Sequence, residues 1–133
     1  MLGELISEER GQASGFRVIG SPEHPKVEVS FRAAGTLLGV EHTDIGTYES
    51  VIQSSGFLYG EGKGVVMGKN GERASWIGQG AGKFKQGGGI SWRGSLYFQT
   101  DSPAFKQLNG IAVMFEHEVD ANDQIVTKLW EWK

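Results

Sequence analysis

Histidine provides the most versatile chemistry among the candidate residues, because its imidazole titrates close to neutral pH. His24 lies in a loop flanked by prolines and is expected at the surface. His42 alternates in step with Leu38 and Val40, and His117 alternates in step with apolar residues on both sides. Both are therefore expected to point inward, because alternate side chains of a strand share a face. There a neutral imidazole binds a ligand, exchanges a proton or is simply hydrogen-bonded in the core.

Carboxylates flank both of these histidines, in Glu41-His42-x-Asp44 and in Glu116-His117-Glu118. A metal site needs ligands that converge, but strand alternation sends sequence neighbours to opposite faces. The sequence therefore predicts neither a metal nor a cofactor. Glu41 and Asp44 keep two orientations open, because a bulge at nearby Gly46 would reverse the alternation.

Aromatic side chains are the other candidates for contact with a ligand. Tyr48 is the best-placed phenol for acid–base chemistry, and the tryptophans present planar faces on which a ligand can stack. The predicted ligand-binding residues are His42, Tyr48, Trp76, Trp92, Phe98 and His117. Core packing is the alternative role for at least two of the four tryptophans. No serine-nucleophile motif is present, so no catalytic residue is assigned.

Length, charge and composition exclude several classes of protein. The 133 residues fit one domain, residues 1–133, and the absence of cysteine excludes disulfides and thiolate zinc sites. A net charge of −3 argues against nucleic-acid binding. The first ten residues carry three acids and one base, unlike a secretory leader, and the longest apolar run is only Ile111 to Phe115. We expect a cytoplasmic protein that binds neither nucleic acid nor membrane.

The segments that position these residues alternate between apolar and polar side chains, and Gly, Asn, Asp and Ser separate them. Strands are predicted at residues 4–19, 27–32, 35–53, 57–68, 73–84, 90–100, 111–119 and 125–132. Pro22 and Pro25 bracket the loop before the second strand. Ser102, as cap, and Pro103 predict a short helix near residues 103–109. About eight strands joined by short hairpins predict an all-β, eight-stranded antiparallel up-and-down (meander) barrel.

Three hairpin turns, at residues 54–56, 69–71 and 85–89, predict the register of the central strands. The predicted pairs are Ile52 with Leu58, Tyr48 with Gly62, Gly62 with Gly78, Gly64 with Trp76, Gly82 with Trp92, Gly78 with Leu96, Trp76 with Phe98 and Phe84 with Ile90. Even-numbered residues then share the inner face, including Ile52 and Phe84. The alternative is a two-residue Asn70-Gly71 turn, which would point Glu61 and Lys63 inward.

Glycine is the compositional outlier, with 21 residues in 133 against a usual ~7%. Most of the glycines in the central strands fall on the predicted inner face, among the large aromatics. One interpretation is that aromatic rings pack over them, and the other is that they leave a lumen for a ligand. Gly60-x-Gly62-x-Gly64 lies within a strand and does not open a helix, so it does not predict a phosphate site.

The predicted outer face carries a ribbon of apolar side chains among its polar residues. Its members are Val51, Tyr59, Val65, Ile77 and Tyr97. Such a ribbon is typical of an interface between copies of one chain, and it predicts a homo-oligomer.

Several segments together resemble a bacterial family of uncharacterised small proteins whose fold is similar to the allene oxide cyclase barrel. They are residues 46–50, 59–64, 78–84 and 93–100, with the Lys128-Leu129-Trp130-Glu131-Trp132 ending. The resemblance covers essentially the whole chain and implies an eight-stranded antiparallel barrel. It implies no reaction, because no catalytic glutamate of the cyclases can be aligned on this chain.

Three functions follow from these observations. The first is a binding module that takes a small apolar or aromatic molecule into its lumen. The second is an isomerase or cyclase for an apolar substrate, with His42, His117, Tyr48 or an acid as the proton shuttle. The third is a structural homo-oligomeric protein with a filled core.

Overall fold

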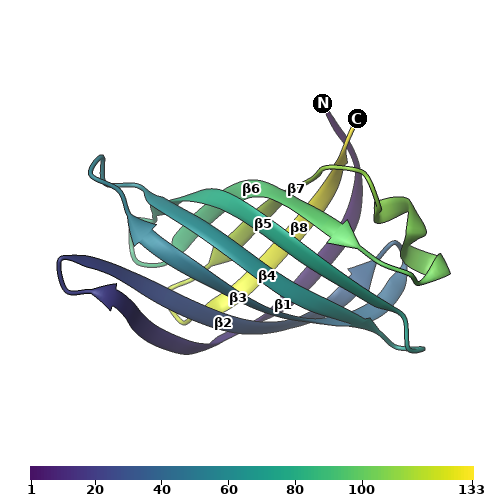
Figure 1. The fold of residues 1–133 in the computed structure, drawn as a ribbon, viewed down its shortest axis with the longest axis horizontal. Helices are drawn as coiled ribbons and strands as arrows, with labels where there is room; N and C mark the ends of the chain where they lie inside the picture. Colours follow the sequence, from purple (N-terminus) through teal and green to yellow (C-terminus); the bar gives the residue numbers. More distant parts are fainter.

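The computed structural model describes residues 1–133 as one closed antiparallel barrel (Figure 1). Its elements are β1 (Leu2–Ser21), β2 (His24–Leu37), β3 (Val40–Ile52), β4 (Leu58–Gly68), β5 (Arg73–Phe84), β6 (Ile90–Gln99), a 3-10 helix η1 (Pro103–Leu108), β7 (Val113–Val119) and β8 (Gln124–Trp132). Each strand pairs with the next, and β8 pairs with β1, which leaves no free sheet edge. The predicted eight-stranded up-and-down barrel is confirmed.

The central strands pair in the predicted register. Tyr48 lies opposite Gly62, Gly64 opposite Trp76, and Gly82 opposite Trp92. The three-residue turn at 69–71 is present, with Gly71 at a φ of 93°, so the alternative two-residue turn is wrong. Glycine is required there because an L side chain is disfavoured at positive φ. Glu61 and Lys63 consequently remain exposed on the outer face.

Three local expectations are wrong. The segment 35–53 is divided by a turn at Leu38 and Gly39, both at positive φ, because β2 and β3 form a hairpin there. Pro25 belongs to β2, so the preceding turn contains only Pro22 and Glu23. Ser102 does not cap the helix with its side chain, because its Oγ accepts a hydrogen bond from the Arg73 amide.

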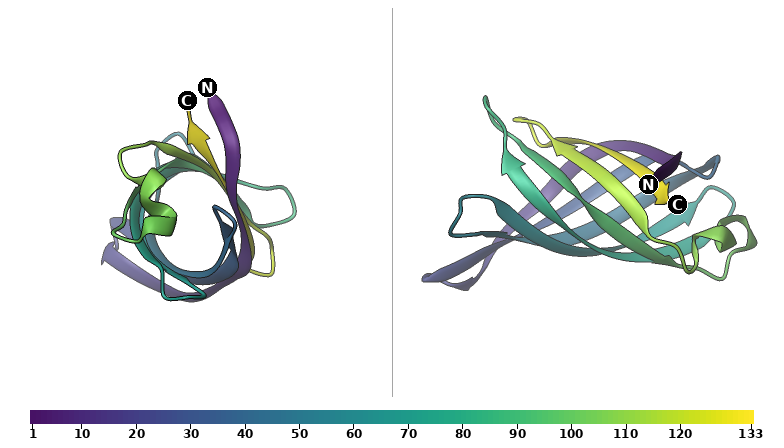
Figure 2. Two further views of the ribbon diagram at one scale, coloured as in Figure 1. Left: turned by 90° about the vertical axis from the view of Figure 1, so that its right-hand side faces the viewer. Right: turned by 90° about the horizontal axis from the view of Figure 1, so that it is seen from above.

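The two ends of the barrel differ. At one, called here the helix end, η1 lies at one side of the barrel rim (Figure 2). Phe105 and Leu108 of η1 are fully buried, as is Val113 at the start of β7. At the other, the hairpin end, lie the turns β1–β2, β3–β4, β5–β6 and β7–β8. Ile52 and Phe84, expected inside, are 64% and 58% exposed at the hairpin end, because their strands extend beyond the packed core. The helix end is closed and the hairpin end is not.

Aromatic rings lie over the glycines of the inner face. A Cβ atom at Gly64 would overlap the Trp76 ring, and one at Gly60 or Gly82 would overlap the Trp92 ring. The packing interpretation of the glycine excess is therefore correct at these positions. The single helix, six residues long, is much shorter than a bilayer span.

Candidate functional site

A cavity of about 70 Å³ remains inside the barrel, called here the lumenal cavity. All six predicted ligand-binding residues contribute to its wall: His42 and Tyr48 from β3, Trp76 from β5, Trp92 and Phe98 from β6, and His117 from β7. The inward direction expected for both histidines is confirmed, since each is less than a tenth exposed. His24 is exposed in the β1–β2 hairpin, as expected. A volume of this size accommodates a few waters or one small chemical group.

A polar cluster of Glu9, His42, Asp44 and Trp76 occupies one side of this cavity. His42 Nε2 lies 2.7 Å from Glu9 Oε2, and the Trp76 indole N–H donates to Asp44 Oδ1 at 2.9 Å. The Trp76 ring reaches Asp44 by crossing β4 at Gly64 and lying against Gly46 on β3. A side chain at either glycine would block this path. The glycines therefore make the hydrogen bond between β5 and β3 feasible.

The two carboxyls of the polar cluster both have raised pKa values, because both are buried. Burial raises the pKa of Asp44 well above its ordinary value, and the neighbouring charge of Glu9 raises it further. Burial also raises the pKa of Glu9, although a hydrogen bond with Asp44 opposes that rise. These directions fit a protonated Asp44 that donates to a Glu9 carboxylate. His42 then donates its Nε2–H to the same carboxylate, and burial lowers the pKa of His42.

His117 forms a second buried polar contact beside the polar cluster, because its partner Thr127 on β8 lies directly opposite Glu9 on β1. Its Nδ1 lies 2.6 Å from Thr127 Oγ1, the residue directly across from it on β8. Burial lowers the pKa of His117 to about 4, so the imidazole is neutral at physiological pH. Its other nitrogen, Nε2, is buried and has no hydrogen-bond partner in the chain.

Tyr48 lies between His117 and Trp92 and contacts both with its ring. Its ring centroid lies 5.9 Å from that of His117 and 5.6 Å from that of Trp92, with near-perpendicular planes in both pairs. Burial raises the pKa of Tyr48 to about 12, although the neighbouring Trp92 indole opposes the rise. The indole Nε1–H of Trp92 is itself buried without a well-formed hydrogen bond. Two buried polar atoms, one on Trp92 and one on His117, thus flank the same tyrosine.

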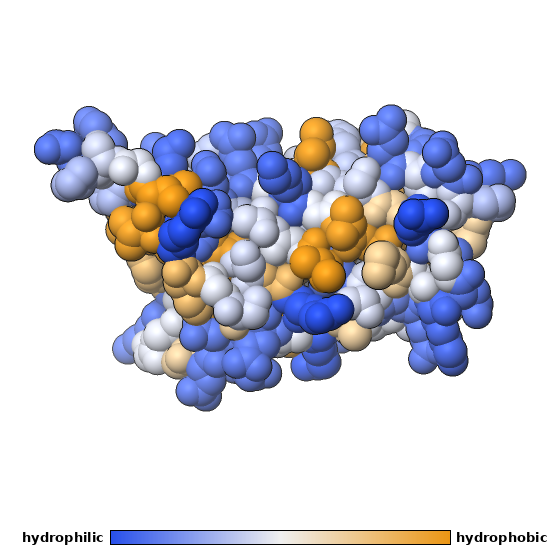
Figure 3. All heavy atoms as spheres, turned by 60° about the horizontal axis from the view of Figure 1, so that its bottom comes forward, coloured by the Kyte–Doolittle hydropathy of each residue, from blue (hydrophilic) through white to orange (hydrophobic).

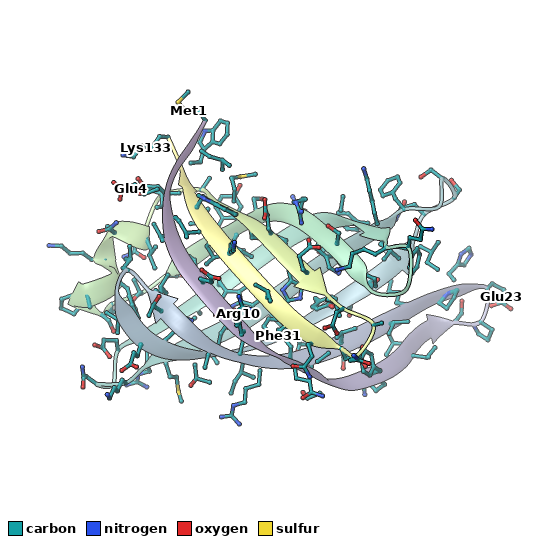
Figure 4. The ribbon with its side chains drawn as sticks, turned by 180° about the vertical axis from the view of Figure 1, so that it is seen from behind. Met1, Glu4, Arg10, Glu23, Phe31 and Lys133 are labelled. Atoms are coloured by element: carbon teal, nitrogen blue, oxygen red, sulfur yellow. The ribbon has the colours of Figure 1, made fainter.

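A larger hollow of about 730 Å³ opens at the hairpin end, called here the outer hollow. Glu23, at the tip of the β1–β2 hairpin, belongs to its rim, whereas Phe31 lies near the middle of the barrel (Figure 4). Tyr48 and Trp92 border both the outer hollow and the lumenal cavity. These two rings therefore form the boundary between the open end of the barrel and its polar interior.

Sequence reasoning missed Glu9 and Thr127 and left the direction of Asp44 open. The signal for Asp44 was its shared alternation with His42, since no bulge interrupts β3 against its neighbours. The β1 strand, by contrast, changes register between Leu5 and Ser7 and again between Ala13 and Gly15. Alternation cannot be followed through such irregularities, so an inward glutamate could not be distinguished from an outward one. No three carboxylate or imidazole groups are arranged to hold a metal ion.

Comparison with known proteins shows the fold. No family model and no curated protein sequence matches the chain. A conserved protein of unknown function from Rhodopseudomonas palustris superposes with a TM-score of 0.81 at 12% identity, over 98% of this chain and 97% of its own. A protein with unknown function from Clostridium acetobutylicum gives 0.82 at 10%, over 96% of each chain. A beta-barrel like protein from Acinetobacter baumannii gives 0.82 at 10%, over 100% of this chain and 96% of its own.

These neighbours confirm the resemblance to uncharacterised bacterial barrel proteins at the level of fold. None of the three is described as a cyclase. Identities of 10–12% carry no information about ligand or reaction, which must be argued from the lumen itself.

Proposed function

We propose that the barrel binds a small, mostly apolar molecule with a flat or aromatic body. The molecule enters through the hairpin end, lies in the outer hollow and places one polar group in the lumenal cavity. The observation that carries this proposal is the position of Tyr48 and Trp92, which border both spaces beside the buried, unpartnered Nε2 of His117.

The energetics of buried polar atoms support binding at this place. More than about nine in ten buried polar groups in folded proteins have a hydrogen-bond partner. Leaving one unpaired costs about 1–3 kcal/mol, which a ligand group can recover. The outer hollow also falls within the ~300–1,000 Å³ typical of small-molecule pockets.

The six predicted residues divide into two groups under this proposal. Tyr48, Trp92 and His117 meet a ligand that arrives from the hairpin end. His42, Trp76 and Phe98 line the deeper part, where the first two already hydrogen-bond to the carboxyls of the polar cluster. The first group is therefore proposed to contact the ligand, and the second to support the site.

The test is binding of the fluorescent apolar probe N-phenyl-1-naphthylamine to the protein and to two variants. Leu96→Trp places a larger ring in the lumen, whereas Tyr97→Trp places the same ring on the outer face of the same strand. We expect saturable fluorescence enhancement in the parent and in Tyr97→Trp, and its loss in folded Leu96→Trp. Enhancement that survives unchanged in Leu96→Trp, or that never occurs, would contradict lumenal binding.

A second candidate function is isomerisation of an apolar substrate by proton transfer. The observation that favours it is the pair of buried carboxyls, Glu9 and Asp44, which line the cavity and both have raised pKa values. One carboxylate would take a proton from carbon, and its neighbouring acid would return one elsewhere on the same molecule, so no cofactor is consumed.

Deuterium exchange would test this second candidate. A ketone that binds the lumen is incubated with the protein in D₂O, and loss of its α C–H signal is followed by NMR. Proton transfer by the polar cluster predicts exchange above the buffer rate that Glu9→Gln abolishes and the exposed control Glu8→Gln retains. Exchange at the buffer rate with a bound ketone would exclude this activity for that substrate class.

A further inference from the structure

We infer that the lumenal ligand is uncharged and carries a hydrogen-bond acceptor, such as a ketone, ester or aldehyde oxygen, at its inner end. The inference rests on the proposed binding function and names the chemical class that this lumen can accept. It distinguishes the barrel from one built to hold a fatty acid or another organic anion.

The charges around the lumenal cavity argue against an anion. Neither Lys nor Arg contributes to its wall, and the acidic side chains buried there are Glu9 and Asp44. Neither histidine provides a positive charge that could pair with a ligand anion, because His42 is hydrogen-bonded to Glu9 and His117 is neutral at physiological pH. A carboxylate ligand would therefore lose its hydration without gaining a counter-ion, which is strongly unfavourable in a low-dielectric interior.

The outer hollow is also lined by more acidic than basic side chains. Its acids are Glu23, Asp120 and Asp123, and its only lysine is Lys26. Lys26 lies 3.8 Å from Glu49, so part of its charge is already compensated. The negative charge of Asp123 acts as far as Tyr48, where it disfavours a second anion. An anionic ligand would thus meet repulsion along the whole path from the hairpin end to the cavity.

Hydrogen-bond donors at the boundary define the polar group. The indole nitrogen of Trp92 can only donate, and it is buried with the Tyr48 side chain nearby but without a well-formed hydrogen bond. The Tyr48 hydroxyl remains protonated at physiological pH, and it lies close enough to that indole for the indole to lower its pKa. A single acceptor oxygen between the two rings would take both N–H and O–H bonds. A hydrocarbon would leave the Trp92 N–H unpaired, so the acceptor is a requirement for tight binding.

Three naphthalene derivatives of matched shape test the inference: 2-acetylnaphthalene (neutral acceptor), 2-naphthoate (anion) and 2-isopropylnaphthalene (no acceptor). Their dissociation constants are measured by calorimetry at pH 7.5. We expect 2-acetylnaphthalene to bind at least about tenfold more tightly than either of the others. Binding of 2-naphthoate as tight as that of the ketone would overturn the neutral class. Equal binding of 2-isopropylnaphthalene would overturn the requirement for an acceptor.

The variant Trp92→Phe separates the hydrogen bond from the shape of the site. We expect it to weaken 2-acetylnaphthalene about fivefold to tenfold while changing 2-isopropylnaphthalene less than about twofold. Equal weakening of both ligands would assign Trp92 a packing role and contradict the inference. Unchanged binding of both ligands would contradict it as well.

If N-phenyl-1-naphthylamine binds and none of the three derivatives does, this inference alone fails. If that probe does not bind either, the proposed function fails with it.

Discussion

Two tryptophans in the same lumen differ in their hydrogen bonds, and this difference should be measurable. Trp76 donates to Asp44, whereas the Trp92 indole makes no well-formed hydrogen bond. Replacing Trp76 by Phe leaves a buried carboxyl oxygen without its donor, but the same change at Trp92 removes a group that was unpaired. We expect Trp76→Phe to lower the free energy of unfolding by about 1–3 kcal/mol more than Trp92→Phe. Urea denaturation of both variants measures the difference, and equal losses would contradict it.

Asp44 should make stability depend on pH. Because its pKa is raised in the folded state, the folded protein retains a proton that the unfolded chain releases above about pH 4. The contribution of Asp44 to the free energy of unfolding is therefore most favourable below pH 4 and is lost as pH rises toward the raised pKa. Asn at this position keeps an oxygen for Trp76 and an N–H₂ for Glu9. We expect Asp44→Asn to be more stable than the parent at pH 8 and to lose this advantage near pH 4.

Thermal unfolding at pH 4, 6 and 8 measures this effect. The matched control is Glu41→Gln, an exposed acid on the same strand, which should follow the parent at every pH. Taking the difference between variant and parent removes the opposite pH dependence that buried His117 contributes, since that imidazole is present in both proteins. A difference that does not vary with pH would show that the pKa of Asp44 is not raised in the folded protein.

At the scale of the strands, glycine determines where aromatic rings can lie. Gly46, Gly64 and Gly82 provide flat backbone under Trp76 and Trp92, so that rings from one strand reach across to the next. Methyl groups at such positions would displace a buried ring. The glycine excess is therefore a property of ring packing across strands and not of chain flexibility.

Alanine substitutions at two glycines test this account. A Cβ at Gly64 would overlap the Trp76 ring, whereas at Gly15 the nearest atom lies 3.9 Å away. We expect Gly64→Ala to destabilise the protein by about 1–3 kcal/mol. Gly15→Ala should be neutral or stabilising by up to about 1 kcal/mol, because it restricts the unfolded chain. Chemical denaturation distinguishes the two, and a tolerated Gly64→Ala would show that the ring can move aside.

The turns explain why the register of β3 to β6 was predictable. Three-residue turns with Gly56 and Gly71 at positive φ connect neighbouring strands, so local sequence determines which residues face each other. The β1 strand has no such constraint where it meets β8, because that pair is the farthest apart in sequence and has two register shifts. The inward direction of Glu9 follows from those shifts, and so only the folded chain reveals it.

At the scale of the whole molecule, the outer face presents apolar side chains to solvent. Figure 3 shows them on one side of the barrel in separate groups with polar residues between them. Ile77 and Tyr97 lie opposite each other on β5 and β6, and both are at least half exposed. Exposed apolar side chains of this kind are typical of interfaces.

Self-association through this face therefore remains our prediction for the protein in solution. Light scattering of the parent should give more than the 14.5 kDa of one chain. The double variant Ile77→Lys and Tyr97→Lys should return that mass. Glu8→Arg with Arg10→Glu, a charge exchange on β1 four strands away from β5, should leave the assembly intact. A parent of one-chain mass at high concentration would contradict the prediction.

By itself, the sequence determined the barrel and its inner face, because alternation and turn chemistry are local properties that act between neighbouring residues. His42, Trp76 and Trp92 could be placed inside on that basis. Only the folded structure showed that Glu9 of β1 meets His42 of β3 across β2, since Glu9 lies opposite Gly35 and Gly35 lies opposite His42. Closure of the barrel then left Tyr48 and Trp92 between a polar interior and an open end. These positions depend on the register and stagger of several paired strands, which no single segment encodes.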